Sequence, residues 1–155
     1  MRKLLVIADD SAEAETALKY AALRARNTGA TVVVLSVIQP TRFEHWAAVR
    51  DEVAREARSS AENRLSHFVS LSESLAEHTP EGHIEEGDLK TALEATIAKD
   101  PEIKILILAA GVDRKAGPGP LVSALNKDGL FQDRALPVLI VPGNASEDDI
   151  KALAN

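Results

Sequence analysis

The stretch that decides the fold is Ile103-Lys-Ile-Leu-Ile-Leu-Ala-Ala110-Gly111-Val-Asp-Arg-Lys-Ala-Gly117-Pro-Gly119-Pro120. Its apolar half predicts a strand buried on both faces of a parallel sheet. Ligands of such sheets bind outside the carboxyl ends of the strands, where a glycine-rich turn lets backbone N–H groups approach an anion. The stretch therefore predicts a central strand followed either by an anion-binding loop or by an ordinary exposed loop.

Four further strands are predicted outward from this one. Residues 4–8, 31–38 and 138–141 are short apolar runs rich in β-branched side chains, whereas residues 83–86 are polar and indicate a strand at the sheet edge. Helical patterns separate the strands. They cover about residues 14–28, ended by Gly29; a long helix from a Thr41–Glu44 capping box to about Ala76; residues 89–99, capped by Asp88; about residues 121–134; and a short terminal helix near residues 146–150.

This strict alternation of strands and helices predicts a doubly wound α/β fold, with right-handed crossovers and helices on both faces of a five-stranded parallel sheet. We expect one domain over residues 1–144, followed by a tail of residues 145–155 that contains the short terminal helix.

Composition excludes several classes of function. The 155 residues carry a net charge of −6, which argues against a nucleic-acid-binding surface. The absence of cysteine removes disulfides and thiolate chemistry. The first apolar run stops at Asp9-Asp10 and is too short for a secretion signal or a membrane span. We therefore expect a cytoplasmic protein with neither nucleic acid nor a membrane as partner.

Polar residues follow the first strand directly, at Asp9-Asp10-Ser11. Asp10 or Ser11 is expected to cap the next helix, with Glu13 completing a capping box if Asp10 is the cap. Asp9 lies one residue too early for that role, and its carboxylate is equally suited to accept hydrogen bonds from a ribose or an adenine. Sequence motifs for phosphate-loop hydrolases and serine nucleophiles are absent. We therefore expect no catalytic residue, no metal site and no enzymatic activity.

Five sequence blocks, in order and over nearly the whole chain, together resemble the universal stress protein family. They are Val6-Ile-Ala-Asp9-Asp-Ser11, Gly29-Ala-Thr-Val-Val-Val-Leu-Ser-Val37, Glu86-Gly-Asp88, Ile105-Leu-Ile-Leu-Ala-Ala-Gly111 and Leu136-Pro-Val-Leu-Ile-Val-Pro142. The resemblance implies a Rossmann-like sheet of the adenine nucleotide alpha hydrolase-like type, in strand order 3-2-1-4-5. Asp9 would then lie beside Gly111.

The phosphate loop departs from the pattern of nucleotide-binding members of that family. Their loop reads Gly-x-x-Gly, nine residues, then Gly-Ser or Gly-Thr, and here only Gly111 matches, since Arg114, Ala124 and Leu125 occupy the other positions. The resemblance thus implies a stress-response regulatory or binding module with weak or no adenine-nucleotide binding. The alternative is a true ATP or AMP sensor with a remodelled phosphate loop, the Gly-Pro loop of residues 111–120. The candidate nucleotide-binding residues are Asp9, Val37, Ala110, Gly111, Arg114, Gly117, Gly119 and Ser123.

The last strand gives an expectation about assembly. Val138, Leu139, Ile140 and Val141 form an uncharged apolar strand, which is a liability at an open sheet edge. The resemblance implies that two such strands pair antiparallel across a two-fold axis. We therefore expect a homodimer, and the alternative is an edge covered by the terminal segment, residues 146–153.

Overall fold

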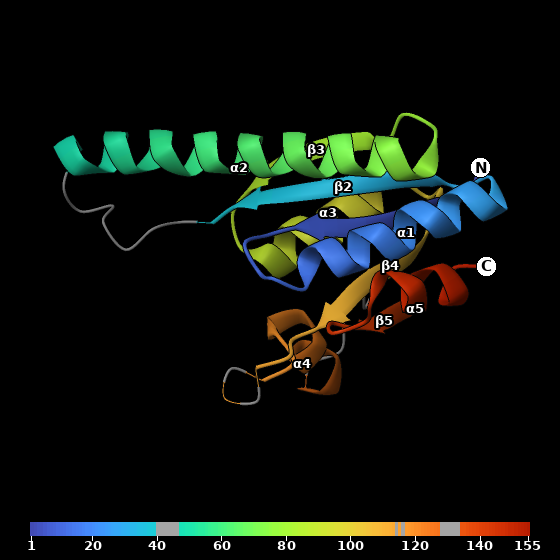
Figure 1. The fold of residues 1–155 in the computed structure, drawn as a ribbon. Coiled ribbons are helices and arrows are strands. Elements are labelled where there is room, and N and C mark those ends of the chain that lie inside the picture. Colours follow the sequence, from blue (N-terminus) through green and yellow to red (C-terminus); the bar gives the residue numbers. More distant parts are fainter. Residues whose placement is uncertain (40–46, 114, 116, 128–133) are drawn as a thin grey trace.

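The computed structural model describes residues 1–39, 47–113, 115, 117–127 and 134–155. Strands and helices alternate along the chain, and both termini lie at the same end of the sheet (Figure 1). The elements are β1 (Lys3–Ala8), α1 (Ala14–Thr28), β2 (Thr31–Ile38), α2 (Ala47–Ala76), β3 (Glu81–Glu86), α3 (Leu89–Lys99), β4 (Ile103–Ala110), α4 (Pro120–Lys127), β5 (Val138–Pro142) and α5 (Glu147–Leu153).

The five strands form one parallel sheet in the order β3-β2-β1-β4-β5. This confirms the predicted fold class, the strand order and the edge position of the polar strand β3. β1 is the central strand. It pairs continuously with β2, Leu5 opposite Val33, and it pairs with β4, Leu5 opposite Leu106, with a shift of register between Lys3 and Leu4. The carboxyl ends of β1 and β4 therefore lie side by side, which is where the chain changes its winding direction.

Side chains of β1 point alternately into two separate cores, as the pleat of a strand requires. Leu4 and Val6 pack with buried residues of α1 and α2, whereas Leu5 and Ile7 pack with residues of α3 such as Leu93. Buried Ser36 on β2 fixes α2 to the sheet by donating a hydrogen bond from Oγ to the carbonyl oxygen of Ala61, at 3.0 Å. Both faces of the sheet are thus covered by helices.

The helix ends follow their expected chemistry at several places. Gly29 ends α1 in the left-handed conformation, φ +74°, and the carboxylate of Asp88 caps α3 by accepting a hydrogen bond from the Thr91 N–H. Ser146 caps α5 with a complete capping box. The predicted Thr41–Glu44 box and residues 128–133 of the predicted fourth helix lie outside the described residues, and Arg134 is not helical.

Lys3 joins three acidic side chains at the amino ends of the strands. Its ammonium lies 2.8 Å from Asp100, 2.9 Å from Glu81 and 3.3 Å from Glu102, and its side chain is only 11% exposed. The hydrogen bond to Asp100 is the largest cause that raises the pKa of Lys3, and the same bond lowers the pKa of Asp100 below its ordinary value of 3.8. This cluster fixes the start of β1 to β3 and to the turn before β4.

We expect Lys3→Met to lower the free energy of unfolding at pH 7 by about 1 kcal/mol. The difference from wild type should be greatest between about pH 5 and pH 10. It should shrink as pH falls through the lowered pKa of Asp100, because the protonated acid loses its ion pair, and as pH rises past 10.5, the ordinary pKa of Lys3, towards its raised pKa. Urea unfolding at a series of pH values measures this, and a difference that does not vary with pH would contradict it.

Candidate functional site

The predicted loops meet at the carboxyl ends of β1 and β4. They enclose a small cavity of about 80 Å³, lined by Asp9, Ser11 and Glu13 from one side and by Ala109, Pro118 and Gly119 from the other. The structure therefore brings Asp9 and the Gly-Pro loop together. Pockets that hold small ligands usually measure about 300–1,000 Å³, so the cavity is too small for a nucleotide in this conformation.

Three backbone N–H groups of the described part of the Gly-Pro loop are bonded to oxygens of the loop itself. The Gly111 N–H donates to the carbonyl oxygen of Pro118 and the Gly117 N–H to that of Asp113, both at 3.0 Å. The Lys115 N–H donates to the Asp113 carboxylate at 2.9 Å. An anion nest requires free N–H groups that converge on one point, and these three donors already have partners within the loop.

Glu13 lies against this loop. A methyl group placed on Gly111 would come within 3.3 Å of Glu13 Oε1 and within 2.7 Å of the Gly117 carbonyl oxygen. One placed on Gly143, just after β5, would lie 2.1 Å from the Ala110 carbonyl oxygen and 3.0 Å from Glu13 Cβ. Both glycines thus permit close approaches of backbone, and they leave the carboxylate of Glu13 beside the first glycine of the loop.

Asp9 organises the turn between β1 and α1. Its Oδ1 accepts hydrogen bonds from the N–H and the hydroxyl of Ser11, at 2.8 and 2.5 Å, while Oδ2 has no hydrogen-bond partner among the described residues. The expectation that Asp10 or Ser11 caps α1 is wrong. The cap residue is Glu13, with no side-chain cap bond, because Asp9 already engages Ser11 and Asp10 instead faces Arg64 of α2 at 3.4 Å.

A second cavity of about 530 Å³ lies on the α2 side of the same turn. Asp9 and Asp10 line it from the turn, and Arg64, His67 and Phe68 line it from α2. His67 Nε2 lies 2.6 Å from a carboxylate oxygen of Glu15, and the Nε of Arg64 is buried without a hydrogen-bond partner among the described residues. Asp9 therefore borders two hollows of different size, a small one at the Gly-Pro loop and a larger one against α2.

The other predicted site residues are placed less closely together. Val37 is buried near the end of β2 and does not line the small cavity. Ala110 ends β4 and Gly111 follows it, and the Ser123 N–H donates to the Gly119 carbonyl oxygen within the first turn of α4. Gly117 and Gly119 take positive φ angles of 79° and 107°, which suit glycine. Arg114 lies outside the described residues.

Sequence reasoning missed the position of Glu13 and Gly143. Glu13 was expected only as part of a capping box, and no role was predicted for Gly143. The glycine directly after the last strand was the available signal, because strand ends of a parallel sheet converge on one edge. No sequence pattern indicates that a glutamate of the first loop reaches the loop after β4.

The sequence matches the model of one protein family, and the structure is similar to solved structures of that fold. The family model described as "Universal stress protein family" matches residues 1–127. The universal stress protein UspA from Lactobacillus plantarum superposes with a TM-score of 0.74 at 19% identity, covering 90% of this chain and 97% of that one. No curated protein matches the sequence.

Two structurally similar proteins were solved with nucleotides. A universal stress protein in complex with cAMP has a TM-score of 0.57 at 16% identity, covering 92% of this chain and 98% of that one. The universal stress protein from Archaeoglobus fulgidus in complex with dAMP has a TM-score of 0.56 at 17% identity, covering 90% and 97%. At these identities the likeness establishes the fold alone.

Neither a membrane span nor a metal cluster occurs in the part of the chain that the structure describes. None of its helices is long and apolar enough to cross a bilayer. Within the same residues, no group of three or more His, Asp or Glu side chains is arranged to hold a metal ion.

Gly111→Ala tests the closed loop. The added methyl group would meet the Gly117 carbonyl oxygen at 2.7 Å, so we expect the loop to open and stability to fall by about 1–3 kcal/mol. Amide hydrogen exchange at Gly117 should accelerate. The control is Val112→Ala, since Val112 is 56% exposed. Unchanged exchange in Gly111→Ala would show that the loop is not held by this contact.

Proposed function

This chain belongs to the universal stress protein family, and from that premise we propose that it is a non-catalytic, cytoplasmic binding module of the stress response with weak or no affinity for adenine nucleotides. The observation that carries the proposal is the engagement of the loop N–H groups of Gly111, Lys115 and Gly117 by oxygens of the loop itself. A phosphate would have to displace these bonds. Each charged hydrogen bond forgone costs about 1.5–3 kcal/mol, so two weaken binding about a hundredfold or more.

Glu13 adds electrostatic repulsion. Its carboxylate lies where a phosphate bound at Gly111 would approach. Two like charges 4 Å apart repel by about 4 kcal/mol at an effective dielectric constant of 20. The penalty grows with the charge of the ligand, so ATP should suffer more than AMP.

The adenosine side of the site supports residual binding. Oδ2 of Asp9 has no hydrogen-bond partner among the described residues and can accept a bond from a ribose hydroxyl or an adenine amino group. We include the backbone near Val37 and Gly111 in this candidate site. AMP can use these groups, and because it carries one phosphate its repulsion from Glu13 is smaller than that of ATP.

The alternative is a genuine nucleotide sensor whose Gly-Pro loop rearranges on binding. Two observations favour it: the positive φ angles of Gly117 and Gly119, and the likeness to proteins solved with cAMP and dAMP. An enzymatic role has the least support, because the sequence contains no motif for a nucleophile or a phosphate-loop hydrolase.

We also propose a homodimer formed through β5. Among the described residues β5 pairs with β4 alone, and its Ile140 is 41% exposed. An unpaired apolar edge strand is a template for a second strand, and a two-fold axis would let two copies of β5 pair antiparallel.

Calorimetric titration with AMP and ATP tests the nucleotide proposal. We expect ATP to bind more weakly than about 100 µM, and AMP to bind at least as well as ATP. Glu13→Gln removes the repulsion without changing the size of the side chain, so it should strengthen ATP binding about tenfold and AMP binding less.

Glu15→Gln is the matched control, because Glu15 does not line the small cavity and its carboxylate faces His67 instead. It should leave both affinities unchanged. Tight ATP binding by the wild-type protein, unaffected by Glu13→Gln, would support the sensor instead.

Ile140→Lys tests the dimer. A charge in the middle of the exposed edge strand should weaken strand pairing, so we expect sedimentation velocity to show a dimer for wild type and mainly monomer for the variant at micromolar concentration. The control is Val112→Lys, which adds the same charge at an exposed apolar residue outside β5. A wild-type protein that sediments as a monomer would contradict the proposal.

A further inference from the structure

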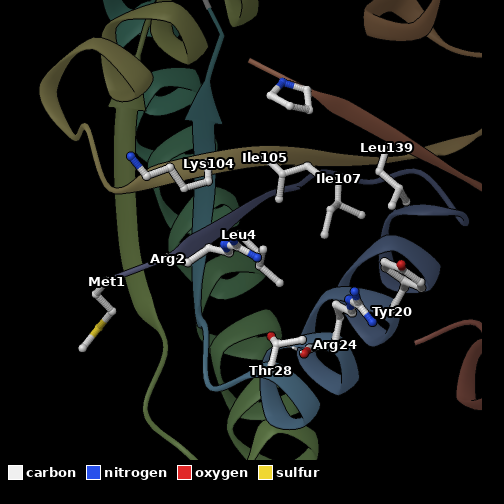
Figure 2. A pocket seen from close by; sticks show the side chains of 11 residues that line it. Met1, Arg2, Leu4, Tyr20, Arg24, Thr28, Lys104, Ile105, Ile107 and Leu139 are labelled. Carbon is white, nitrogen blue, oxygen red and sulfur yellow. Dashed lines mark hydrogen bonds between the residues drawn. The ribbon is translucent and has the colours of Figure 1, made fainter. Parts of the chain in front are cut away.

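A groove opens at the opposite end of the sheet from the candidate nucleotide site. It measures about 630 Å³ and lies where α1 crosses the amino-terminal halves of β1, β4 and β5 (Figure 2). We call it the basic groove, and its principal lining residues are Arg2, Leu4, Tyr20, Arg24, Ile105 and Leu139. Its volume is in the range of pockets that hold small organic molecules.

The floor of the basic groove is apolar. Figure 2 shows Ile105, Ile107 and Leu139 pointing from the sheet towards α1, with Leu4 beside them. Ile105 and Leu139 are only partly buried. Apolar surface of this kind gains free energy when a ligand removes it from water, so the floor favours an aliphatic body.

The rim of the groove is basic. Arg2, Arg24 and Lys104 line it, and no acidic residue among those described does so, although the chain as a whole carries a net charge of −6. The guanidinium of Arg2 has neither an ion pair nor a hydrogen bond among the described residues, and only its main-chain carbonyl oxygen is bonded, to the Thr31 N–H. Nη1 of Arg24 is bonded to main-chain oxygens of Ala154 and Asn155, which leaves its Nη2 and Nε without partners in the described part of the chain. Guanidinium groups with free donors bind carboxylates in a bidentate manner.

Tyr20 provides a second polar group. The residue is only 8% exposed and lines the groove, and its hydroxyl has no hydrogen-bond partner in the described part of the chain. The hydroxyl is not one of the buried unpaired polar atoms of the described residues, so it is open to the groove. It can therefore donate a hydrogen bond to a polar head group bound there.

We propose that the basic groove binds a medium-chain aliphatic carboxylate, with its head at Arg2, Arg24 and Tyr20 and its chain on Ile105, Ile107 and Leu139. An inorganic anion would leave the apolar floor in water, and an uncharged alkane would leave the arginines and the tyrosine hydroxyl unpaired. Only an amphipathic anion satisfies both halves of the groove. This site is independent of the nucleotide proposal, because it lies at the other end of the strands.

Calorimetric titration with sodium decanoate, kept below its micelle concentration, tests the proposal. Octanoate should bind about threefold to fourfold more weakly for each methylene removed. 1-Decanol, which has the same chain without the charge, should bind at least about tenfold more weakly. Amide chemical shifts in a ¹⁵N-labelled sample should move at Thr28, Ile107 and Leu139 and remain unchanged at Asp9 and Gly111.

Three variants separate the head-group contacts from general stability. Arg2→Ala and Arg24→Ala should each weaken decanoate binding about tenfold, and Tyr20→Phe, which removes only the hydroxyl, about threefold. Arg26→Ala is the matched control, since Arg26 is on the same helix but pairs with Glu77 outside the groove. Because Arg24 also bonds the residues after α5, the result with Arg2→Ala decides between a lost contact and a loosened helix.

Three outcomes would overturn the proposal. Decanoate binding that Arg2→Ala and Arg24→Ala leave unchanged would show that the arginines do not hold a head group. Equal affinity for decanol and decanoate would show that the groove binds the aliphatic chain alone and has no site for a carboxylate. A dimeric protein that does not bind decanoate, and whose groove amides are protected from exchange, would assign the groove to a second copy of the chain.

Discussion

β1 is buried on both of its faces, and this constraint determines where the other elements can lie. Its alternate side chains enter two separate cores, so helices must cover both sides of the sheet. Right-handed crossovers satisfy this only if the chain winds one way from β1 through β2 to β3 and the other way from β4 to β5. The loops after β1 and β4 consequently lead to helices on opposite faces of the sheet. The crevice between them, at the carboxyl ends of these two strands, is therefore a consequence of how the core is built.

The protein itself occupies this crevice. Backbone N–H groups in a buried or partly buried loop must find acceptors, and in nucleotide-binding loops the ligand can be that acceptor. Here the Gly111 and Gly117 N–H groups use carbonyl oxygens of the same loop, and Glu13 lies beside them. Glycine therefore has a different purpose at these positions. At Gly111 it permits the loop to fold back on its own backbone, which is compatible with the loss of the phosphate-binding pattern in the sequence.

The sequence predicted the strands, most helix ends and the meeting of Asp9 with the Gly-Pro loop, because each depends on local patterns or on the rule that strand ends share an edge. The prediction failed at the turn before α1, where neighbouring polar side chains can form alternative hydrogen bonds. Asp10 or Ser11 was expected to cap α1, but Asp9 accepts hydrogen bonds from both the N–H and the hydroxyl of Ser11, and Asp10 faces Arg64. It also failed for Glu13, whose contact with Gly111 joins positions about a hundred residues apart. The basic groove likewise joins residues that are distant in sequence. Arg2 and Lys104 are brought together by the pairing of β1 with β4, and Arg24 is added by the packing of α1 on these strands.

Charge is distributed unevenly between the two ends of the sheet. At the carboxyl ends of the strands, Asp9, Asp10 and Glu13 lie around the crevice, and the side chains of Arg64 and His67 already face Asp10 and Glu15. At the amino ends, acidic residues such as Glu102 are held by Lys3 and by the amino group of Met1, while the rim of the basic groove remains cationic. A net charge of −6 describes neither end. Electrostatics therefore disfavours highly charged anions in the crevice at the carboxyl ends of the strands, and it favours an anionic head group at the rim of the basic groove.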